Sequence, residues 1–368
     1  MPRHPRLHSP PVGSQAVTLE VDIGLQLGTL ELDVQFEAQP GELLAVLGPN
    51  GAGKSTVLRC IAGLLPVDRG CIRVDGETVD DPRASVLVPA ERRSTGVVFQ
   101  DYLLFDHLSA LDNVAFGLRA RGADKRHARR VATEWLERTG MADHAGHRPR
   151  ALSGGQAQRI ALARALATDP RVLLLDEPLA ALDAGARATM RRDLRRHLGS
   201  FEGMALLVTH DPVDAYALAD RVVVLEDGRV VQHGTLADVT AHPRSRYVAE
   251  LVGLNLVHGS LLGSVLATSS GATIVTADHD ADDGDAFVSI RPQAVSLHRQ
   301  RPEGSARNAW HLVVRDVDMR QDRVRVALDG DLPIVAEITT AALAELDVRP
   351  GAAVWATVKA TDITAYGS

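Results

Sequence analysis

The stretch from Gly48 to Thr56 has the residue types and the spacing that hold a chain of phosphates. It reads, in order, Gly48, Pro49, Asn50, Gly51, Ala52, Gly53, Lys54, Ser55 and Thr56. This is the complete pattern G-x-x-x-x-G-K-[ST], in which glycines leave room for backbone N–H groups to point at phosphate oxygens. Lys54 is expected to reach the β- and γ-phosphates, and the Ser55 hydroxyl to ligate Mg²⁺. The sequence therefore predicts a nucleoside triphosphate site in this stretch.

Two adjacent carboxylates, Asp176 and Glu177, follow an apolar run at residues 172–175. Asp176 can hold Mg²⁺ directly or through water, and Glu177 can polarise a water molecule for in-line attack on the γ-phosphate. The same pair could be a plain turn at the end of a strand, and that interpretation would be favoured in a chain without a phosphate loop. Because the loop is present, the pair predicts hydrolysis of the bound nucleotide.

The phosphate loop lies between a predicted strand and a predicted helix, which is the setting that it needs. Residues 43–47 are a continuous apolar run, typical of a strand buried on both faces, and residues 56–65 have helical periodicity. Further apolar runs alternate with helices at 172–175, 205–208 and 222–225. Residues 17–36 alternate apolar and polar side chains, as half-buried antiparallel strands do. The expected fold class is α/β with a mostly parallel sheet.

The helix expected after Asp183 carries Met190, Leu194 and Leu198 on one face. A run of four arginines lies on the same helix: Arg191, Arg192, Arg195 and Arg196. We interpret these arginines as exposed surface rather than as a ligand site.

The composition excludes several classes of function. The net charge of −7 argues against nucleic acid as the main partner, because phosphate backbones require concentrated Lys and Arg. No apolar run approaches the ~20 residues that span a bilayer, and the first residues lack the apolar core of a secretory signal. The two cysteines, Cys60 and Cys71, are expected to be reduced thiols of a cytoplasmic protein. Any membrane role is therefore expected to come from docking onto another chain.

The length of the chain and the change in its pattern of apolar and turn residues predict two domains. Residues 1–15 are expected to be a flexible arm, residues 16–235 a P-loop nucleotide-binding domain whose helical subdomain covers 101–167, and residues 236–252 a linker. Residues 253–368 contain short apolar runs separated by turn residues, with one helix at 340–346. This second domain is predicted to be a small OB-like β-barrel with a regulatory role.

A third motif, Leu152-Ser153-Gly154-Gly155-Gln156, lies between the phosphate loop and the carboxylate pair. The three motifs in this order resemble the ATP-binding cassette (ABC) family over roughly the part of the chain before residue 235. The resemblance implies ATP and Mg²⁺ as cofactors and head-to-tail homodimers. It also implies that Ser153, Gly154, Gly155 and Gln156 complete the ATP site of the second protomer, with Ser153 facing the γ-phosphate.

The resemblance implies roles for three further residues. Gln100 matches the glutamine that senses Mg²⁺ and links the core to the helical subdomain. Asp183 matches the loop that couples the two ATP sites, and His210 matches the switch histidine that contacts the γ-phosphate. The expected catalytic residues are Lys54, Gln100, Glu177 and His210, and the expected Mg²⁺ ligands are Ser55, Gln100 and Asp176.

One position departs from the family pattern. Many ABC proteins stack the adenine ring on an aromatic residue upstream of the phosphate loop, where this chain has Leu25 and Leu27. The only aromatic residue before Gly48 is Phe36. Two alternatives remain open: adenine packs on aliphatic side chains, or selectivity for the base is weaker.

The second domain resembles the domain appended to importer ATPases. The sequence at 305–308 is similar to the Ser-Ala-Arg-Asn element of small molybdate-binding (Mop) domains, and residues 358–363 are similar to their Lys-Ala-Ser element, so the Mop-like part covers 304–368. A tetrahedral oxyanion needs hydroxyl, backbone and cationic donors. The candidates are Ser305, Arg307, Asn308, Lys359 and Thr361. The alternative is that these are turn and edge-strand residues of a domain that only dimerises.

Together these resemblances predict the ATP-hydrolysing subunit of an importer of molybdate or tungstate. It would dock on two membrane permease subunits at the cytoplasmic face of the cell membrane, and an external solute-binding protein would deliver the anion. Sulfate, ferric iron, polyamine or sugar are the alternative cargoes. From other classes, an oxyanion sensor or storage protein remains an alternative, whereas a cassette acting on DNA or ribosomes is disfavoured because neither a long coiled coil nor a second cassette occurs.

Overall fold

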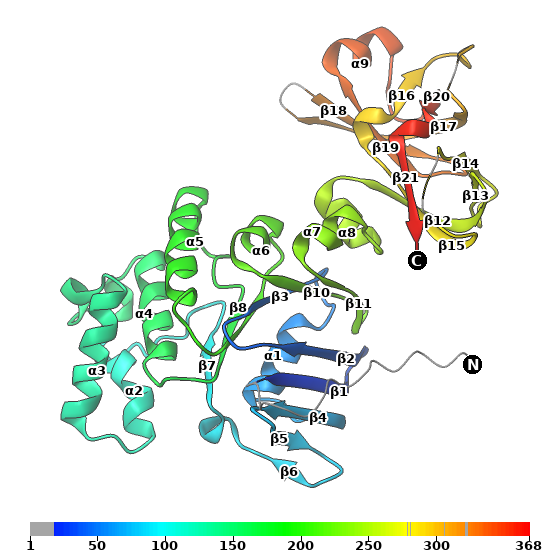
Figure 1. The fold of residues 1–368 in the computed structure, drawn as a ribbon. Coiled ribbons are helices and arrows are strands. Elements are labelled where there is room, and N and C mark those ends of the chain that lie inside the picture. Colours follow the sequence, from blue (N-terminus) through cyan, green and yellow to red (C-terminus); the bar gives the residue numbers. More distant parts are fainter. Residues whose placement is uncertain (1–17, 278, 280, 305, 321–322) are drawn as a thin grey trace. The chain divides into compact units, whose positions relative to one another are not determined.

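The computed structural model describes residues 18–277, 279, 281–304, 306–320 and 323–368. The chain divides into two compact units, Met1–Leu236 and Ala237–Ser368, and each has its own hydrophobic core (Figure 1). The arm expected at 1–15 and the candidate residue Ser305 lie outside the described residues.

An eleven-stranded mixed sheet forms the centre of the N-terminal unit, in the order β6-β5-β4-β1-β2-β11-β10-β3-β9-β8-β7. Its parallel part consists of β10 (Arg221–Glu226), β3 (Leu43–Leu47), β9 (Met204–Val208), β8 (Val172–Asp176) and β7 (Thr95–Val98). The other strands are β1 (Leu19–Leu27), β2 (Leu30–Ala38), β4 (Arg69–Val74), β5 (Glu77–Asp81), β6 (Val86–Leu87) and β11 (Arg229–Gly234).

Most of these other strands pair antiparallel, because short turns join β1 to β2, β4 to β5 and β10 to β11. The expectation of a mostly parallel sheet is therefore correct only for the strands beside the phosphate loop. The antiparallel pair predicted within residues 17–36 is confirmed, and so is the α/β fold class.

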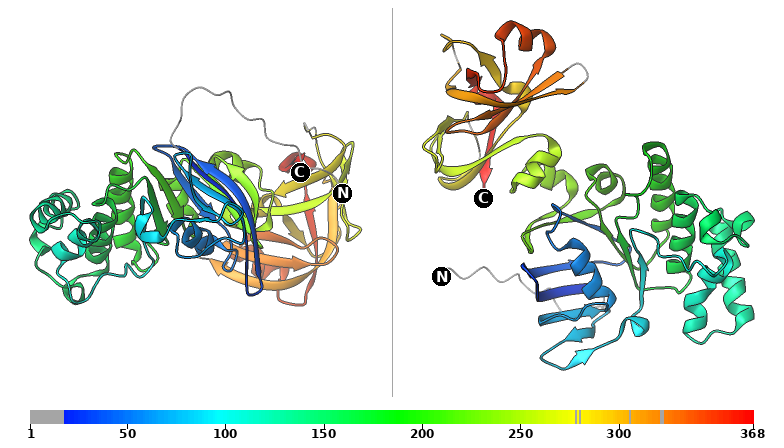
Figure 2. Two further views of the ribbon diagram at one scale, coloured as in Figure 1. Left: turned by 90° about the horizontal axis from the view of Figure 1, so that it is seen from below. Right: turned by 180° about the vertical axis from the view of Figure 1, so that it is seen from behind.

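Helices cover both faces of the parallel strands, because successive side chains of a strand point to opposite faces (Figures 1 and 2). Leu44 and Val46 of β3 enter the core that contains Ile61 of α1 (Lys54–Ala62). Leu43 of β3 and Leu175 of β8 enter a second core. The helices of that second core are α4 (Gly154–Leu166), α5 (Ala184–Leu198) and α6 (Pro212–Leu218), and α6 lies beside α5. This layering places the loops after β3, β8 and β9 at one edge of the sheet.

A helical layer at one end of this unit consists of α2 (Ala110–Ala120), α3 (Lys125–Arg138) and α4 (Figures 1 and 2). Its core includes Val114, Leu136 and Ile160. Three short 3-10 turns complete the unit: η1 (Ala90–Arg92), η2 (Ala142–His144) and η3 (Pro149–Ala151).

Arg93 is fully enclosed in the core of the N-terminal unit. Arg93 is 2% exposed, and its guanidinium group donates hydrogen bonds to Asp80 Oδ2 at 3.1 Å and to the carbonyl oxygens of Cys60 and Ile61 at 2.7 and 3.0 Å. It also donates to the carbonyls of Val79 in β5 and of Val88, which follows β6. The side chain therefore joins the C-terminal end of α1, the helix after the phosphate loop, to the antiparallel strands.

Replacing Arg93 by Met is expected to lower the free energy of unfolding by about 3–5 kcal/mol, because buried Asp80 loses its partner. The matched control is Arg73→Met, which breaks the exposed pair with Glu20 and should cost about 1 kcal/mol or less. Urea denaturation measures both losses. Equal losses for the two variants would show that the buried pair does not hold these elements together.

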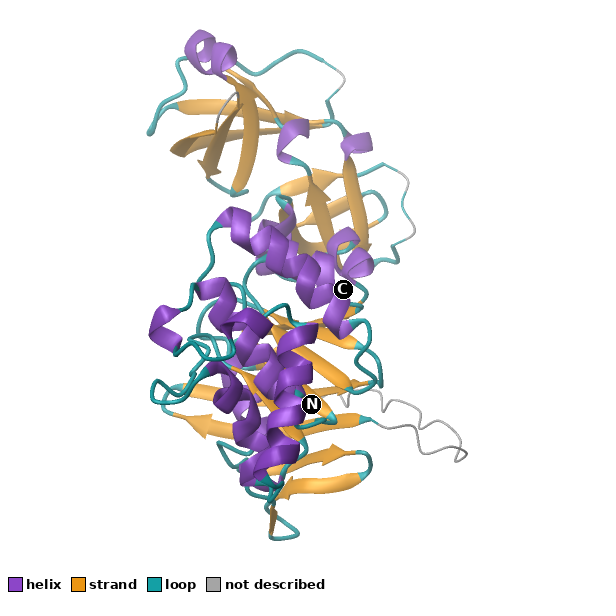
Figure 3. Cartoon of the chain, turned by 90° about the vertical axis from the view of Figure 1, so that its left-hand side faces the viewer, coloured by secondary structure: helices purple, strands orange, loops and turns teal. Residues whose placement is uncertain are grey.

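The C-terminal unit consists of two five-stranded antiparallel sheets around one core (Figure 3). The first sheet, in the order β14-β13-β12-β15-β21, contains β14 (Thr273–Val275), β13 (Val265–Ala267), β12 (Asn255–Leu262), β15 (Gly284–Ile290) and β21 (Ile363–Gly367). The second, in the order β16-β20-β17-β18-β19, contains β16 (Ser296–His298), β20 (Ala353–Val358), β17 (Asn308–Arg320), β18 (Arg323–Asp329) and β19 (Ile334–Thr339). The expected small β domain is confirmed.

Short helices accompany these sheets. The segment 236–252, expected to be a linker, contains α7 (Leu236–Ala241) and α8 (Arg246–Val252), and the helix predicted at 340–346 is α9 (Thr340–Leu346). The 3-10 turns are η4 (Pro292–Ala294) and η5 (Ala360–Asp362). Among the described residues, no helix is both long enough and apolar enough to cross a membrane.

Candidate functional site

The phosphate loop connects β3 to α1 and has the open backbone that phosphate binding requires. Gly48 has a φ of 149°, and a Cβ atom there would lie 2.0 Å from the carbonyl oxygen of Leu225, so only glycine fits. Gly53, with a φ of 99°, precedes α1, and no side chain caps the helix. The N–H groups of the first helical turn are therefore left for an anionic ligand.

Lys54 is enclosed by this loop. Its side chain is 6% exposed, and Nζ donates to the carbonyl oxygens of Gly48 and Pro49 at 2.8 and 2.9 Å. Burial lowers the pKa of Lys54, and the carboxylates of Glu177 and Asp176 oppose that shift. In the sequence Lys54 is far from the two adjacent carboxylates, and the fold brings all three groups to one edge of the sheet.

The carboxylate of Asp176 and the hydroxyl of Ser55 meet at the end of β8. Ser55 Oγ donates to Asp176 Oδ1 at 2.9 Å. Burial raises the pKa of Asp176, while the hydrogen bond from Ser55 lowers it. A hydroxyl and a carboxylate beside a phosphate site are the oxygen donors that Mg²⁺ prefers, so these residues fit that ion.

Glu177 and His210 form a pair beside the phosphate loop. Glu177 has a φ of 45°, a left-handed conformation that is unfavourable for glutamate, and its N–H donates to the carbonyl of Val208 at 2.9 Å. Its Oε2 lies 3.1 Å from Nδ1 of His210, which follows β9. The Glu177 side chain is 17% exposed and that of His210 is 52% exposed, so the pair lies at the surface of the site.

Gln100 lies at the same edge of the sheet as these carboxylates. It follows β7, whose residue Val98 pairs with Leu175 of β8, and its side chain is exposed. Beyond it, Tyr102 and Leu103 have φ values of 59° and 42°. Arg164 of α4 donates to the carbonyls of both residues, at 2.8 and 2.7 Å. The left-handed conformation is thus held by the helix that begins at Ser153.

The third motif forms the N-terminus of α4. Ser153 accepts the Gln156 N–H at 3.4 Å and donates its own N–H to Gln156 Oε1 at 2.8 Å, which is a reciprocal capping box. Gln156 also contacts Nε2 of His144 at 2.9 Å. Ser153 and Gly154 are exposed, so this helix end is accessible to another molecule.

Asp183 is exposed and caps α5, where its Oδ1 accepts the N–H of Ala186 at 2.9 Å. Arg187 lies one turn later on α5 and bonds Asp211, the residue after His210. The sequence patterns did not indicate this residue. The interpretation of the arginine run as exposed surface is wrong for Arg191. The Arg191 side chain is 19% exposed and bonds Asp214 of α6 through two nitrogens, at 2.6 and 2.9 Å. The approach of α6 to α5 depends on tertiary packing, which arginine spacing does not reveal.

Upstream of the phosphate loop, aliphatic side chains occupy the region where the family resemblance implies an aromatic residue that stacks on adenine. Leu25 is buried, whereas Leu27 at the end of β1 is 46% exposed. Leu30 at the start of β2 lies beside the phosphate loop, since a Cβ atom on Gly53 would be 3.4 Å from its Cδ2. This hairpin therefore offers an aliphatic surface next to the loop.

In the C-terminal unit, two of the candidate oxyanion residues lie at the same end of a strand pair. Asn308 of β17 pairs with Val358 of β20, so Arg307 and Lys359, the residues just beyond the two strands, lie at the same end of the pair, and both are exposed. Thr361, also exposed, follows in η5.

Asn308 itself is 2% exposed, and its side chain is bonded to the backbone of β14 and β20. Its Oδ1 accepts the Val275 N–H at 2.7 Å, and its Nδ2 donates to the carbonyls of Val275 and Val358 at 2.8 and 3.3 Å. Both ends of the carboxamide are used, which argues for a structural role and against direct binding of an anion.

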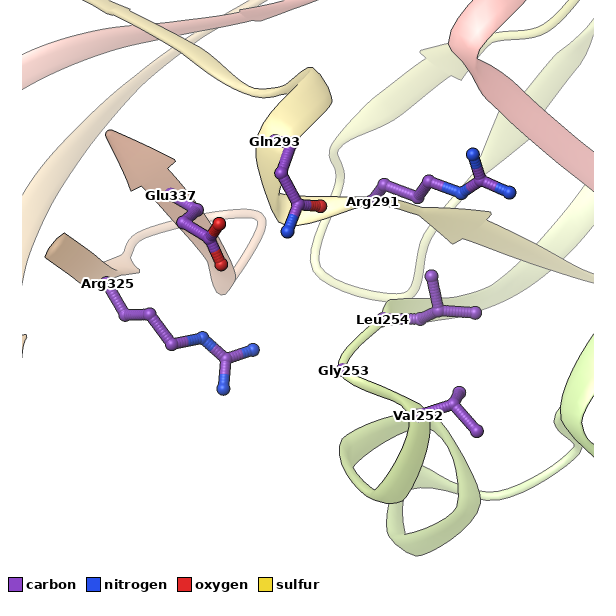
Figure 4. Close-up of a pocket in the computed structure, with 7 residues that line it drawn as sticks. All are labelled: Val252, Gly253, Leu254, Arg291, Gln293, Arg325 and Glu337. Atoms are coloured by element: carbon purple, nitrogen blue, oxygen red, sulfur yellow. The ribbon is translucent and has the colours of Figure 1, made fainter. Parts of the chain in front are cut away.

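A pocket of about 380 Å³ lies elsewhere in the same unit (Figure 4). Arg325, Gln293 and Glu337 face it from three different elements, and Glu337 is bonded to Arg323 at 2.8 Å. Hydrogen bonds from Gln293 and Arg323 lower the pKa of Glu337, which favours its negative charge. Because this carboxylate lines the pocket and none of the described candidates Arg307, Asn308, Lys359 and Thr361 does, we do not assign the anion site to this pocket.

Comparison with known proteins gives matches for both units. Residues 32–180 match the family model described as ABC transporter, and residues 304–365 match the TOBE domain. The ATP-binding cassette MJ0796, solved as a dimer in a post-hydrolysis state with ADP and phosphate, superposes with a TM-score of 0.51 at 31% identity. That match covers 60% of this chain and 98% of the other.

Three relatives illustrate the range of related proteins. The molybdenum import ATP-binding protein ModC of Mycobacterium tuberculosis is 44% identical over 346 residues, or 91% of this chain and 94% of that protein. The molybdate/tungstate import ATP-binding protein WtpC of Pyrococcus horikoshii is 35% identical over 91% of this chain and 95% of its own length. The sulfate/thiosulfate import ATP-binding protein CysA of Bacillus cereus is 40% identical over 76% of this chain and 78% of its own length.

Proposed function

The chain belongs to the ATP-binding proteins of ABC transporters, and we propose that it energises the import of molybdate or tungstate by hydrolysing ATP. Membership of the family carries the ATPase activity. The proposed cargo rests on the 44% identity to a molybdenum import protein over 346 residues, an alignment that extends over both units. The remaining steps of the proposal concern individual residues and partners.

In the proposed site, the residues of the phosphate loop hold the triphosphate. The free N–H groups at the start of α1 and the Lys54 ammonium group bind the β- and γ-phosphates. Nζ of Lys54 would exchange its bonds to the carbonyls of Gly48 and Pro49 for phosphate oxygens. The aliphatic surface of Leu27 and Leu30 packs against adenine in place of an aromatic ring.

Ser55 and Asp176, which are already bonded to each other, and Gln100 at the same edge of the sheet are the proposed ligands of Mg²⁺. The ion, when bound, neutralises charge that develops on the phosphates. Glu177 orients the attacking water and accepts its proton on a carboxylate oxygen, while His210 holds that carboxylate through Nδ1 at 3.1 Å. The left-handed backbone of Glu177 aims the side chain at the site.

A head-to-tail homodimer completes each proposed site. The exposed N-terminus of α4, with Ser153 and Gly154, would face the γ-phosphate bound by the partner, where the helix dipole favours negative charge. The dimeric state reported for the similar cassette supports this arrangement. Because each site is assembled only when the dimer closes, ATP hydrolysis should be slow in the absence of the permease subunits.

The helical layer is the proposed docking surface for two permease subunits, which places the chain peripherally at the cytoplasmic face of the membrane. Leu103 and Phe116 are 54% and 44% exposed there, and Phe105 packs against Phe116 with ring centroids 4.4 Å apart. Arg164 contacts the carbonyl of Leu103 and the face of Phe105, so it links this surface to α4. An external solute-binding protein would deliver the anion to the permease.

The C-terminal unit is proposed to bind the transported oxyanion as a feedback site, through Arg307, Lys359 and Thr361, with Ser305 as a further sequence candidate. Two adjacent cations at one end of a strand pair suit a tetrahedral dianion. If these residues only support dimerisation, the chain remains an importer ATPase. Sulfate is then the second candidate cargo, favoured by the 40% identity to a sulfate/thiosulfate import protein.

Isothermal titration of the full chain tests this anion site, with saturating ADP and Mg²⁺ to fill the phosphate loop. Molybdate or tungstate should bind in preference to sulfate. Lys359→Ala should weaken binding roughly tenfold or more, because a charge-assisted hydrogen bond contributes about 1.5–3 kcal/mol. Arg349→Ala, which removes another exposed cation of this unit, should leave binding unchanged. Absence of molybdate and tungstate binding would remove the feedback site and leave the cargo open.

A further inference from the structure

We propose that Arg187 is a positioning residue that couples the Asp183 segment to the Glu177–His210 pair. Its guanidinium group lies between the segment that follows Glu177 and the segment that follows His210. Nη1 donates to Asp211 Oδ2 at 3.0 Å, and Nη2 donates to the carbonyls of Ala180 and Leu182, both at 3.4 Å. One planar group therefore bonds both the segment that follows Glu177 and the segment that follows His210. This inference rests on the proposed function of that carboxylate.

On one side, Arg187 is tied to the residue expected to couple the two ATP sites. Its backbone N–H donates to the carbonyl of Asp183 at 2.8 Å, and Asp183 also caps α5 through the N–H of Ala186 at 2.9 Å. Asp183 and Arg187 are thus one helical turn apart on the same rigid element. A displacement of Asp183 by a partner protomer would therefore move Arg187 with it.

On the other side, Asp211 fixes the backbone beside His210. Its Oδ1 accepts the N–H of Val213 at 2.8 Å at the start of α6, and its Oδ2 accepts the bond from Arg187. Its own N–H donates to Thr209 Oγ1 at 3.1 Å. His210 lies between the two bonded residues, Thr209 and Asp211. Movement of Arg187 would therefore change where His210 holds Glu177.

The role requires the guanidinium group of arginine. Its planar fork reaches the carboxylate and the carbonyls at the same time, whereas a lysine ammonium group on a flexible stem does not have this geometry. The side chain of Arg187 is 27% exposed and that of Asp211 is 21% exposed, so water screens the pair only in part. Arg191, one turn further along α5, forms a similar ion pair with Asp214 but contacts neither segment of the site.

Arg187→Met and Arg191→Met therefore form a matched pair, since each removes one ion pair between α5 and α6. For the full chain, Arg187→Met is expected to lower the kcat of ATP hydrolysis about tenfold and to leave KM within about twofold, because it removes positioning rather than ATP binding. The kcat of Arg187→Lys should be close to that of Arg187→Met. Arg191→Met should lower the thermal midpoint and leave kcat within about twofold. Equal kcat losses for Arg187→Met and Arg191→Met would overturn the inference.

A double-mutant cycle with Asp183→Asn tests the coupling itself, because asparagine keeps the helix cap and removes the charge. The two kcat losses should not multiply in the double variant, whereas full multiplication would show that the residues act independently. Should Arg187→Met fail to fold, Asp211→Asn breaks the same bond and keeps the cap of α6, and the same loss of kcat is expected. If the unmodified chain hydrolyses no ATP, the proposed function fails. If the unmodified chain hydrolyses ATP and Arg187→Met loses no more kcat than Arg191→Met, only this inference fails.

Discussion

Replacing Glu177 by Gln is expected to lower ATP turnover by about 10²–10⁴-fold while ATP binding stays close to normal. The amide has nearly the shape of the carboxylate but cannot accept the proton of the attacking water. The backbone of Glu177 should keep its left-handed conformation, because its N–H bond to the carbonyl of Val208 does not involve the side chain. Neither Lys54 nor Ser55 depends on the carboxylate for its hydrogen bonds.

Steady-state hydrolysis and binding of a fluorescent ATP analogue measure the two quantities separately. Glu202→Gln is the control, because Glu202 is an exposed carboxylate in the same unit, outside the site. Turnover within about threefold of the unmodified chain would remove Glu177 as the general base, given that a positioned base contributes about 10²-fold or more. A parallel loss of ATP binding would instead assign Glu177 a structural role in the phosphate loop.

Replacing Ser153 by Arg is expected to abolish most turnover while each chain still binds ATP. Ser153 is exposed, and its hydrogen bonds are with Gln156 and Ala157 of its own helix, so it has no part in the phosphate loop of its own chain. In the proposed dimer, a bulky side chain at the N-terminus of α4 would block the partner's γ-phosphate. The expected loss is about 10²-fold or more, as for other groups that stabilise transition-state charge.

Loss of the helix cap alone is a separate effect of this change and costs about 1 kcal/mol of stability. The control is Thr339→Arg, which removes the equivalent cap of α9, where Thr339 accepts the N–H of Ala342 at 3.1 Å. This control should keep full turnover. Comparison of ATP affinity and thermal midpoint for the two variants separates a blocked site from a destabilised chain. Normal turnover of Ser153→Arg would contradict the composite site.

The phosphate-loop motif could be recognised in the sequence because its chemistry fixes both residue type and spacing. Gly48 shows the physical reason, since a side chain there would collide with the carbonyl of Leu225. The family and the ATPase activity predicted from these motifs are confirmed by the comparisons. The strands of the parallel sheet were also predictable, because a strand buried on both faces requires a continuous apolar run.

Arginine partners could not be predicted, because each comes from a distant part of the chain. Arg93 pairs with Asp80 inside the core, Arg187 pairs with Asp211 at the N-cap of α6, and Arg191 pairs with Asp214 of α6. Nothing in the residues around these arginines distinguishes them from exposed ones. For Asn308, a sequence motif suggested a role that the fold does not require. Its place in a short motif suggested an anion ligand, whereas its carboxamide joins two strands in the structure.

The direct test of the central claim is the ATP turnover of an equimolar mixture of Lys54→Met and Ser153→Arg chains. The first variant lacks a working phosphate loop and the second offers a blocked helix end, so each should be nearly inactive alone. In a mixed head-to-tail dimer, the intact loop of one chain faces the intact α4 of the other. About a quarter of the unmodified turnover should return, because half of the dimers are mixed and each has one complete site of two. A mixture no more active than either variant alone would contradict a site shared between two protomers.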